Sequence, residues 1–326
     1  MMKKLLTLGM TCAAALLGGI GGSAAAQDFP SAPVKTIVPY AAGAGLDMMC
    51  RVVSEKLAQY LGHPVVVENR AGAAGTIGAG VVANGSADGH TVLCANNSEI
   101  TLAQHILPKI PFVPERDLAP LVMAVRQTVV LVANPRVLAA GDMRQVIAMT
   151  RQTPLAYGHS GTGNNLYMAM AMFSAEGKVP FIPVAYKGAA PAIADTVAGH
   201  IPMTIANVAP FVGHFKEGRL KPLMVFQGER TPALPDVPTA REVIGTDVRA
   251  ASWFGFFVQS RTSADIRRRL EDGIRRALGE ATVRDKLQAA HMDIAADLPT
   301  DQFARLITEE RAYHATLVKR FDIKAE

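Results

Sequence analysis

The chain has 326 residues, which is more than one compact core usually holds, so two domains are expected. Hydrophobic residues make up 49% of the sequence and charged residues 19%, a balance that fits a globular protein and argues against a disordered one. The formal net charge is +5, but the basic residues are dispersed except for the short cluster Arg267–Arg269 in a helical pattern. Nucleic-acid binding usually needs a basic stripe or a recognised motif, and the sequence shows neither.

The first 26 residues have the pattern of a secretory signal peptide. Two lysines, Lys3 and Lys4, precede an apolar run from Leu5 to Gly22 that is rich in glycine and alanine. An A-x-A cleavage site ends at Ala26. The small residues and the lack of a stop-transfer flank argue against a membrane anchor. We therefore expect residues 1–26 to be removed after Ala26 and exclude them from the fold.

The first part of the mature chain alternates strands with helical patterns. We expect strands at 34–39, 65–69 and 90–95. Asp47 is expected to be the N-cap of a helix with apolar residues at helical spacing. A glycine-rich turn and the start of another helix follow at 71–80. Residues 121–133 form two apolar pieces, and the first is expected to cross between lobes.

A second series of the same kind follows. The expected strands are 155–157, 179–186, 201–206, 220–226 and 252–259, with the last as the return crossover. The expected helices are 143–150, 191–198 and 208–215, and two apolar stripes predict a helical C-terminal part. Strands that alternate with helices predict an α/β fold with a mostly parallel sheet.

Two glycine-rich turns stand out, each between a strand and a helix. One is residues 157–165, with three glycines between a short strand and an apolar helix, and the other is residues 36–47. Such turns direct backbone N–H groups toward one point at the positive end of a helix dipole. Each turn is expected to bind a carboxylate or a phosphate. Two such units far apart in sequence suggest two lobes that face one cleft.

Patterns of catalysis are mostly missing from the sequence. The stretch from Gly158 to Thr162 fails the G-x-S-x-G pattern because Thr162 stands in place of the last glycine, so a serine hydrolase is disfavoured. The sequence has no metal-ligand spacing and no P-loop, and the turn after the first strand lacks G-x-G-x-x-G. We expect no metal and no cofactor.

The mature chain keeps two cysteines, Cys50 and Cys94. Both are expected near the same edge of a parallel sheet, and an exported protein meets an oxidising compartment. A disulfide is therefore possible. Two buried free thiols are an equally good expectation, since free cysteine is among the most buried residue types.

Several stretches, in one order along the chain, resemble the periplasmic solute receptors of tripartite tricarboxylate transporters, also called the Bug receptors. They begin with IVPYAAGAGLD at 37–47, VVVENR at 65–70 and DGHT at 88–91. They continue with YGHSGTG at 157–163, AYKG at 185–188, LPDVPT at 234–239 and WFG at 253–255. Each is weak alone, but together they span nearly the whole mature chain.

The resemblance implies a two-lobed periplasmic binding protein of the Venus-flytrap type, type II, with two crossover strands as the hinge and the ligand closed between the lobes. It implies a periplasmic protein that is not an enzyme. Lobe one is expected at 30–125 plus 250–326, and lobe two at 126–249. The expected partners are a small organic carboxylate and membrane transporter subunits, with no nucleic acid, and the receptor is expected to be a monomer.

The ligand-binding residues are expected on the two turns and on neighbouring strand ends. They are Tyr40, Ala41, Ala42, Gly43, Ala44, Gly45, Asp47, Asn97, Ser98, Gly158, His159, Ser160, Gly161, Thr162, Gly163, Asn164, Tyr186 and Asn207.

The chain departs from the family at Ala206, where family members often have an aspartate. Losing that acid removes a natural partner for a ligand amine, so a dicarboxylate or an aromatic acid is favoured over an amino acid. Asp195 or Glu99 could replace the missing acid if either reaches the cleft. Two other functions stay open: a ligand-sensing partner of a signalling kinase, and a secreted hydrolase that uses Ser160.

Overall fold

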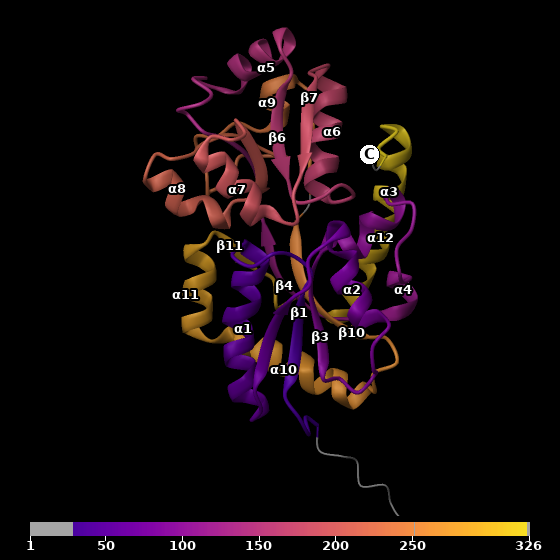
Figure 1. Ribbon diagram of the computed structural model, residues 1–326. Helices are drawn as coiled ribbons and strands as arrows, with labels where there is room; N and C mark the ends of the chain where they lie inside the picture. The colour runs from indigo at the N-terminus through magenta and orange to yellow at the C-terminus, as the bar shows by residue number, and fades with distance from the viewer. Residues whose placement is uncertain (1–28, 251, 325–326) are drawn as a thin grey trace, which may run out of the picture.

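The computed structural model describes residues 29–250 and 252–324; the expected signal peptide lies outside them. The described chain forms two lobes, each built on one β-sheet with helices packed around it (Figure 1). This confirms the predicted two-lobed α/β architecture. None of the described helices has the length and apolarity needed to cross a bilayer.

The first sheet has six strands in the order β11-β4-β10-β3-β1-β2. They are β1 (Val34–Val38), β2 (Val65–Asn69), β3 (Thr91–Asn96), β4 (Leu118–Gln127), β10 (Trp253–Gln259) and β11 (Met292–Ile294). β1 pairs in parallel with β2 and β3, whereas β10 is antiparallel to both β3 and β4. The carboxyl ends of β1 and β3 therefore meet at one edge of the sheet, the edge that faces the other lobe (Figure 1).

The second sheet has five strands in the order β7-β6-β8-β5-β9. They are β5 (Val129–Ala133), β6 (Leu155–His159), β7 (Phe181–Ala185), β8 (Met203–Asn207) and β9 (Lys221–Val225). β6 pairs in parallel with β7 and β8, and β5 is antiparallel to its neighbours β8 and β9. A parallel arrangement is thus correct for the βα units and wrong for the strands that continue from the crossovers.

Two short segments connect the sheets. β4 ends at Gln127 and β5 begins at Val129, so a single residue separates a strand of one sheet from a strand of the other. The second connection runs past Ala250 into β10. The two connections are bonded to each other, since the Gln127 N–H donates to the Ser252 carbonyl at 2.9 Å.

The helices cover both faces of each sheet. They are α1 (Gly45–Leu61), α2 (Thr76–Ala83), α3 (Ala103–Ile106), α4 (Pro114–Asp117), α5 (Met143–Gln152), α6 (Asn165–Gly177), α7 (Ala189–Ala198), α8 (Val212–Lys216), α9 (Ala240–Ile244), α10 (Ala264–Gly279), α11 (Ala281–Ala289) and α12 (Thr300–Arg320). Because both faces are covered, the central strand β10 is buried at every position, as its sequence WFGFFVQ requires.

The start of α1 differs from the prediction. Ala44 is the N-cap residue, with extended backbone, and the helix begins at Gly45. Asp47 lies in the first turn instead, and its carboxylate accepts a hydrogen bond from the Gly43 N–H at 3.0 Å. It also accepts from Arg51 and from the Asn69 side chain. The predicted N-cap role of Asp47 is therefore wrong, because its side chain reaches back from the third helical position.

Several further elements were not expected from the sequence, namely α3, α4, α9, β11 and three short helical turns. A 3₁₀ turn, η1 (Ala73–Gly75), precedes α2, and a π-helical turn, η2 (Ser98–Leu102), follows β3. The helix expected at 208–215 is divided into a 3₁₀ turn, η3 (Ala209–Phe211), and α8, with Pro210 inside the 3₁₀ turn. Proline lacks the N–H that a continuous helix would need.

The C-terminal helix α12 packs on both lobes. Phe303 and Ile307 lie in the core beneath the first sheet, together with Trp253. Leu317 and Val318 belong to the core of the second lobe, and Arg320 pairs with Glu176 of α6 at 2.9 Å. The expected division gives this whole segment to lobe one, but the last turns of α12 pack against lobe two.

Cys50 and Cys94 are both buried, and both are free thiols. Burial, together with the neighbouring Cys50, raises the pKa of the Cys94 thiol well above its usual value. The structure thus has the second of the two arrangements that the sequence left open.

Candidate functional site

The first glycine turn connects β1 to α1 and borders the cleft between the lobes. Gly43 has φ +90°, a conformation that glycine adopts without strain. Its N–H is bonded to Asp47, so this group is already used within the turn. Ala44 and Gly45 line the cleft at the start of α1. The first N–H groups of a helix have no partner within the helix, which makes this end a site for negative charge.

The second turn connects β6 to α6 in the other lobe. Gly161 and Gly163 have φ of +117° and +96°. Asn164 is the N-cap of α6: its side-chain oxygen accepts from the Tyr167 N–H at 2.9 Å. Its amide nitrogen donates to Ser160 Oγ at 2.7 Å, which fixes that hydroxyl at the edge of the cleft.

The two lobes touch across the cleft. The Ala41 N–H donates to the Lys187 carbonyl at 3.3 Å. Ser98 of the first lobe bonds Asn165 of the second, at 2.9 Å from its hydroxyl to the side-chain oxygen and 3.0 Å from the Asn165 N–H. A Cβ on Gly161 would lie 3.4 Å from the backbone of Ala74. The structure is therefore a closed arrangement of the two lobes.

Two hollows lie along this cleft, and both are lined by Tyr40 and Ser160. The smaller one, about 40 Å³, is lined by Tyr40, Ala44, Gly45, Leu46, Asn96, Ser160, Asn165, Leu166, Ala189, Ala206, Asn207, Pro210 and Phe254. The larger one, about 310 Å³, is lined by Tyr40, Gly72, Ala73, Ala74, Gly75, Leu107, Ser160, Gly161, Thr162, Ala185, Tyr186 and Lys187.

The smaller hollow has no charged side chain among its lining residues within the described chain. It offers polar groups instead: the side-chain oxygen of Asn207 is buried and has no hydrogen-bond partner in the described chain. Ala206, at the end of β8, is 1% exposed. Any charge bound here would be stabilised by helix ends and neutral dipoles. In the larger hollow, Lys187 is the charged residue.

The structure brings eight of the predicted site residues into contact with the two hollows. They are Tyr40, Ala44, Gly45, Ser160, Gly161, Thr162, Tyr186 and Asn207. The other ten do not line either hollow: they are Ala41, Ala42, Gly43, Asp47, Asn97, Ser98, Gly158, His159, Gly163 and Asn164. Asn97, for example, donates to Glu310 of α12 at 2.9 Å.

A third turn, Gly72–Gly75, lines the larger hollow, although the predicted site residues do not include it. All four residues have positive φ, including Ala73 at +45° and Ala74 at +51°. The sequence predicts a glycine-rich turn and a helix start at 71–80 but gives them no role in ligand binding. Its position after strand β2 and before α2 repeats the strand–glycine turn–helix design of the other two turns, and that repetition was a signal in the sequence.

Each lobe contributes a tyrosine whose hydroxyl is bonded to an acid. Tyr186 donates to Asp195 at 2.8 Å, and this bond lowers the pKa of that carboxyl. Tyr40 contacts Glu99 at 2.9 Å. The two acids that could have replaced an aspartate at Ala206 are therefore both engaged with tyrosines, and neither lines a hollow.

His159 lies behind the second turn, between Tyr157 and Tyr167, with ring centroids 5.7 and 5.1 Å away. It is 1% exposed, and burial lowers its pKa to about 4. Ser160 is bonded by Asn164 rather than by a histidine. Within residues 29–250 and 252–324, no histidine is bonded to Ser160 as the base of a serine hydrolase would be.

The burial of His159 predicts a loss of stability in acid. The unfolded chain binds the histidine proton near pH 6.5 and the folded chain only near pH 4, so stability is full above 6.5 and falls as the pH drops between these values. The contribution is about 3 kcal/mol, from roughly 1.4 kcal/mol per pKa unit. Urea unfolding of wild type and His159→Phe at several pH values measures it: the phenylalanine keeps the ring packing and should remove this part of the slope. Equal slopes would contradict the assignment.

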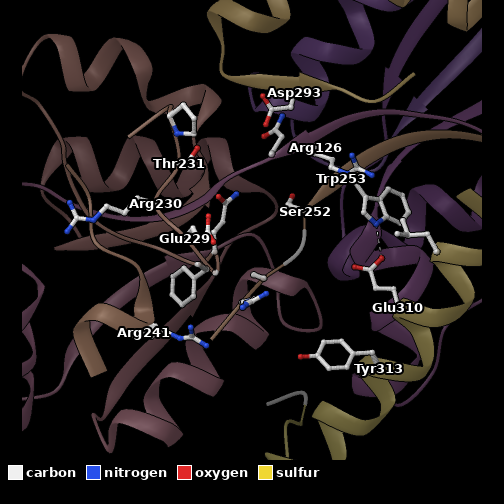
Figure 2. Close-up of a pocket in the computed structure, with 18 of the residues that line it drawn as sticks. Arg126, Glu229, Arg230, Thr231, Arg241, Ser252, Trp253, Asp293, Glu310 and Tyr313 are labelled. Carbon is white, nitrogen blue, oxygen red and sulfur yellow. Dashed lines mark hydrogen bonds between the residues drawn. The ribbon is translucent and has the colours of Figure 1, made fainter. Parts of the chain in front are cut away.

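A third hollow, of about 930 Å³, lies outside the cleft, beside the two connecting segments and α12 (Figure 2). Three of its arginines are paired with acids: Arg230 with Glu242, and Arg241 and Arg249 with Asp247. Trp253 donates to Glu310 at 2.7 Å on its wall (Figure 2). It has no glycine turn at a helix start, so we place the candidate site in the cleft.

Several known proteins resemble this chain in sequence and in fold. The model of the tripartite tricarboxylate transporter family receptor matches residues 49–323. Protein BugT of Bordetella pertussis is 30% identical over 327 residues, covering 99% of both chains. The structure of MatC from Rhodopseudomonas palustris with bound malate has 28% identity and a TM-score of 0.84, and covers 89% of this chain and 100% of its own.

A second R. palustris protein, Rpa4515 with adipate, has 26% identity and a TM-score of 0.86, with 91% of this chain and 100% of that chain covered. Sequence and fold thus agree over nearly the whole described length. The chain belongs to the tripartite tricarboxylate transporter receptor family, whose members are periplasmic solute-binding receptors.

Proposed function

We propose that this protein is an exported receptor that captures a small organic carboxylate between its two lobes and delivers it to the membrane subunits of a tripartite tricarboxylate-type transporter. One observation carries the proposal: two strand–turn–helix units, one on each lobe, direct helix N-termini into the same closed cleft. Main-chain N–H groups at such ends favour a carboxylate. Relatives of similar fold hold malate and adipate, which are both dicarboxylates.

The proposed lobes are residues 30–125 plus 250–326 and residues 126–249, with the signal peptide cleaved after Ala26 in the periplasm. The residues proposed to contact the ligand are those of the two turns that line the hollows, together with Tyr40, Tyr186 and Asn207. The turn Gly72–Gly75 and Lys187 are also proposed to contact the ligand, because they line the larger hollow. Closure about the connecting segments is the proposed motion, because each of them is short and near a strand end.

The ligand is proposed to lack a primary amine. The smaller hollow has no acid among its described lining residues, and Glu99 and Asp195 are bonded to tyrosines. An ammonium buried there would lose its hydration without gaining a counter-ion, which costs several kcal/mol. A dicarboxylate or an aromatic acid avoids this cost.

A thermal-shift screen of the purified mature protein tests the proposed function. Dicarboxylates, tricarboxylates, aromatic acids and amino acids are added one at a time, and an acid that binds the closed form raises the melting temperature. We expect stabilisation by at least one amine-free carboxylate without any turnover of it. Hydrolysis of an ester substrate that is lost in Ser160→Ala would favour the hydrolase instead.

A further inference from the structure

Glu99 is a buried acid next to the candidate site, and it is not among the residues proposed to contact the ligand. It lies in the π-helical turn η2, directly after β3, and is 0% exposed. Its Oε1 accepts the Asn96 N–H at 2.8 Å. Its Oε2 lies 2.9 Å from the hydroxyl of Tyr40, the residue that lines both hollows.

The hydroxyl of Tyr40 makes two contacts but has one proton. Besides Glu99, it lies 3.1 Å from the carbonyl oxygen of Ala74, which can only accept. If Glu99 were ionised, the phenol proton could satisfy Glu99 or Ala74 but not both. If Glu99 carries a proton on Oε2, it donates to the phenol oxygen, and the phenol donates to Ala74. Oε1 already receives an N–H, so Oε2 is the oxygen that has room for the proton.

The surroundings favour this neutral form. Burial raises the pKa of Glu99 to about 8, so the carboxyl is protonated at neutral pH. Tyr40 and Cys94 are the titratable groups on which the charge of Glu99 would act, and burial raises the pKa of each well above its usual value, so both stay neutral over the same range. On the other side of η2, α12 presents Glu310 and His314, which bond Asn97 and Thr101.

The bond to Ala74 matters because of the backbone it holds. Ala73 and Ala74 adopt left-handed conformations, which are unfavourable for alanine because its Cβ crowds the backbone. This turn lines the larger hollow, and the backbone of Ala74 faces Gly161 across the cleft. The chain of contacts from Glu99 through Tyr40 to Ala74 thus ends on the surface that the second lobe closes against.

We propose that Glu99 is a positioning residue that works in its protonated form. Its carboxyl O–H donates a hydrogen bond to the phenol oxygen of Tyr40, which leaves the phenol O–H to donate to the Ala74 carbonyl. That second bond holds the Gly72–Gly75 turn in the conformation that binds the ligand. When Glu99 is ionised, the phenol O–H donates to its carboxylate instead, and the hydrogen bond to the Ala74 carbonyl is lost. The inference rests on the proposed function, because it assumes that this cleft binds the ligand.

A ligand-free measurement tests the proton itself. The infrared spectrum of wild type at pH 7 should contain a protonated-carboxyl stretch that is missing from Glu99→Gln, and titration to pH 9.5 should remove it. Glu310, a second buried acid, remains in both proteins, so the difference between them isolates Glu99. Identical spectra at pH 7 would overturn the proposal whether or not any acid binds.

Calorimetry with adipate from pH 6 to 9.5 tests the role. With a carboxyl that titrates near 8, wild-type affinity should stay level to pH 7 and fall by about 30-fold at pH 9.5, since only the protonated fraction is competent. Glu99→Gln keeps a donor at this place and should bind at pH 7 like wild type, with no alkaline fall. Asp195→Asn, the matched change at the other tyrosine–acid pair, should keep the fall.

The outcomes separate the two hypotheses. An alkaline fall that persists in Glu99→Gln, or a level wild-type profile, overturns the role of Glu99. If wild type binds none of the carboxylates at any pH, the proposed function fails, while the infrared difference still decides the protonation of Glu99.

Discussion

Valine in place of Gly161 is expected to abolish carboxylate binding while both lobes stay folded. Gly161 has φ +117°, and a Cβ there would lie 3.4 Å from the Ala74 backbone of the opposite lobe. The two further methyl groups of valine would occupy part of the hollow that Gly161 lines, and they would also cover the N–H groups of the turn. We expect at least a 100-fold loss of affinity, about 2.7 kcal/mol.

The backbone strain that valine causes at a positive φ must be separated from its obstruction of the ligand site. A side chain at positive φ costs about 1–3 kcal/mol wherever it is placed. Gly218, also in the second lobe, has φ +65°, but a Cβ there would meet nothing within 4 Å. Gly218→Val therefore carries the strain without the block and should bind adipate like wild type. Calorimetry and thermal unfolding of both variants make the comparison, and full binding by Gly161→Val would remove this turn from the site.

Aspartate in place of Ala206 is expected to reverse the preference between ligands with and without an amine. Ala206 is buried at the end of β8 on the smaller hollow, which has no charged lining residue in the described chain. A carboxylate introduced there repels a bound dicarboxylate and offers a counter-ion to an ammonium group. Glutarate and glutamate differ only by the amine. We expect glutarate to lose roughly 100-fold in affinity, about 2.7 kcal/mol, and glutamate to gain.

Ala206→Asn is the matched control, because it has nearly the same shape as aspartate without the charge. It should weaken both ligands by a similar factor through the lost space. If the asparagine variant shifts the ratio of the two affinities as far as the aspartate variant does, charge is not the cause and the amine argument fails. The unfolding midpoint of each variant shows whether the buried aspartate is tolerated when no ligand is bound.

The strands and the two principal turns could be predicted because their signals are local. Runs such as Val65–Asn69 are β-branched and short, and the glycines of 157–163 stand between a strand and an apolar helix. The family resemblance rests on the same local motifs. The roles of supporting residues are harder to predict from local patterns. Asp47 stabilises the turn before its helix and does not cap the helix, because its side chain reaches back to accept a hydrogen bond from the Gly43 N–H.

The backbone conformation of the Gly72–Gly75 turn and the protonation of Glu99 could not be predicted in the same way. Two successive alanines in left-handed conformations contradict their intrinsic preference, and they are held by a bond from Tyr40, which is 34 residues away in sequence. Glu99 gives no sign in the sequence that its carboxyl is buried and protonated. Both features depend on contacts between segments that become neighbours only in the fold.

The most direct test of the account is calorimetric titration of the purified mature protein with glutarate, terephthalate and glutamate, each alone and in competition. We expect at least one amine-free acid to bind with one molecule per chain, and glutamate to fail to displace it at tenfold excess. Tighter binding of glutamate than of glutarate would contradict the account, because no acid of the described cleft is free to pair with its amine.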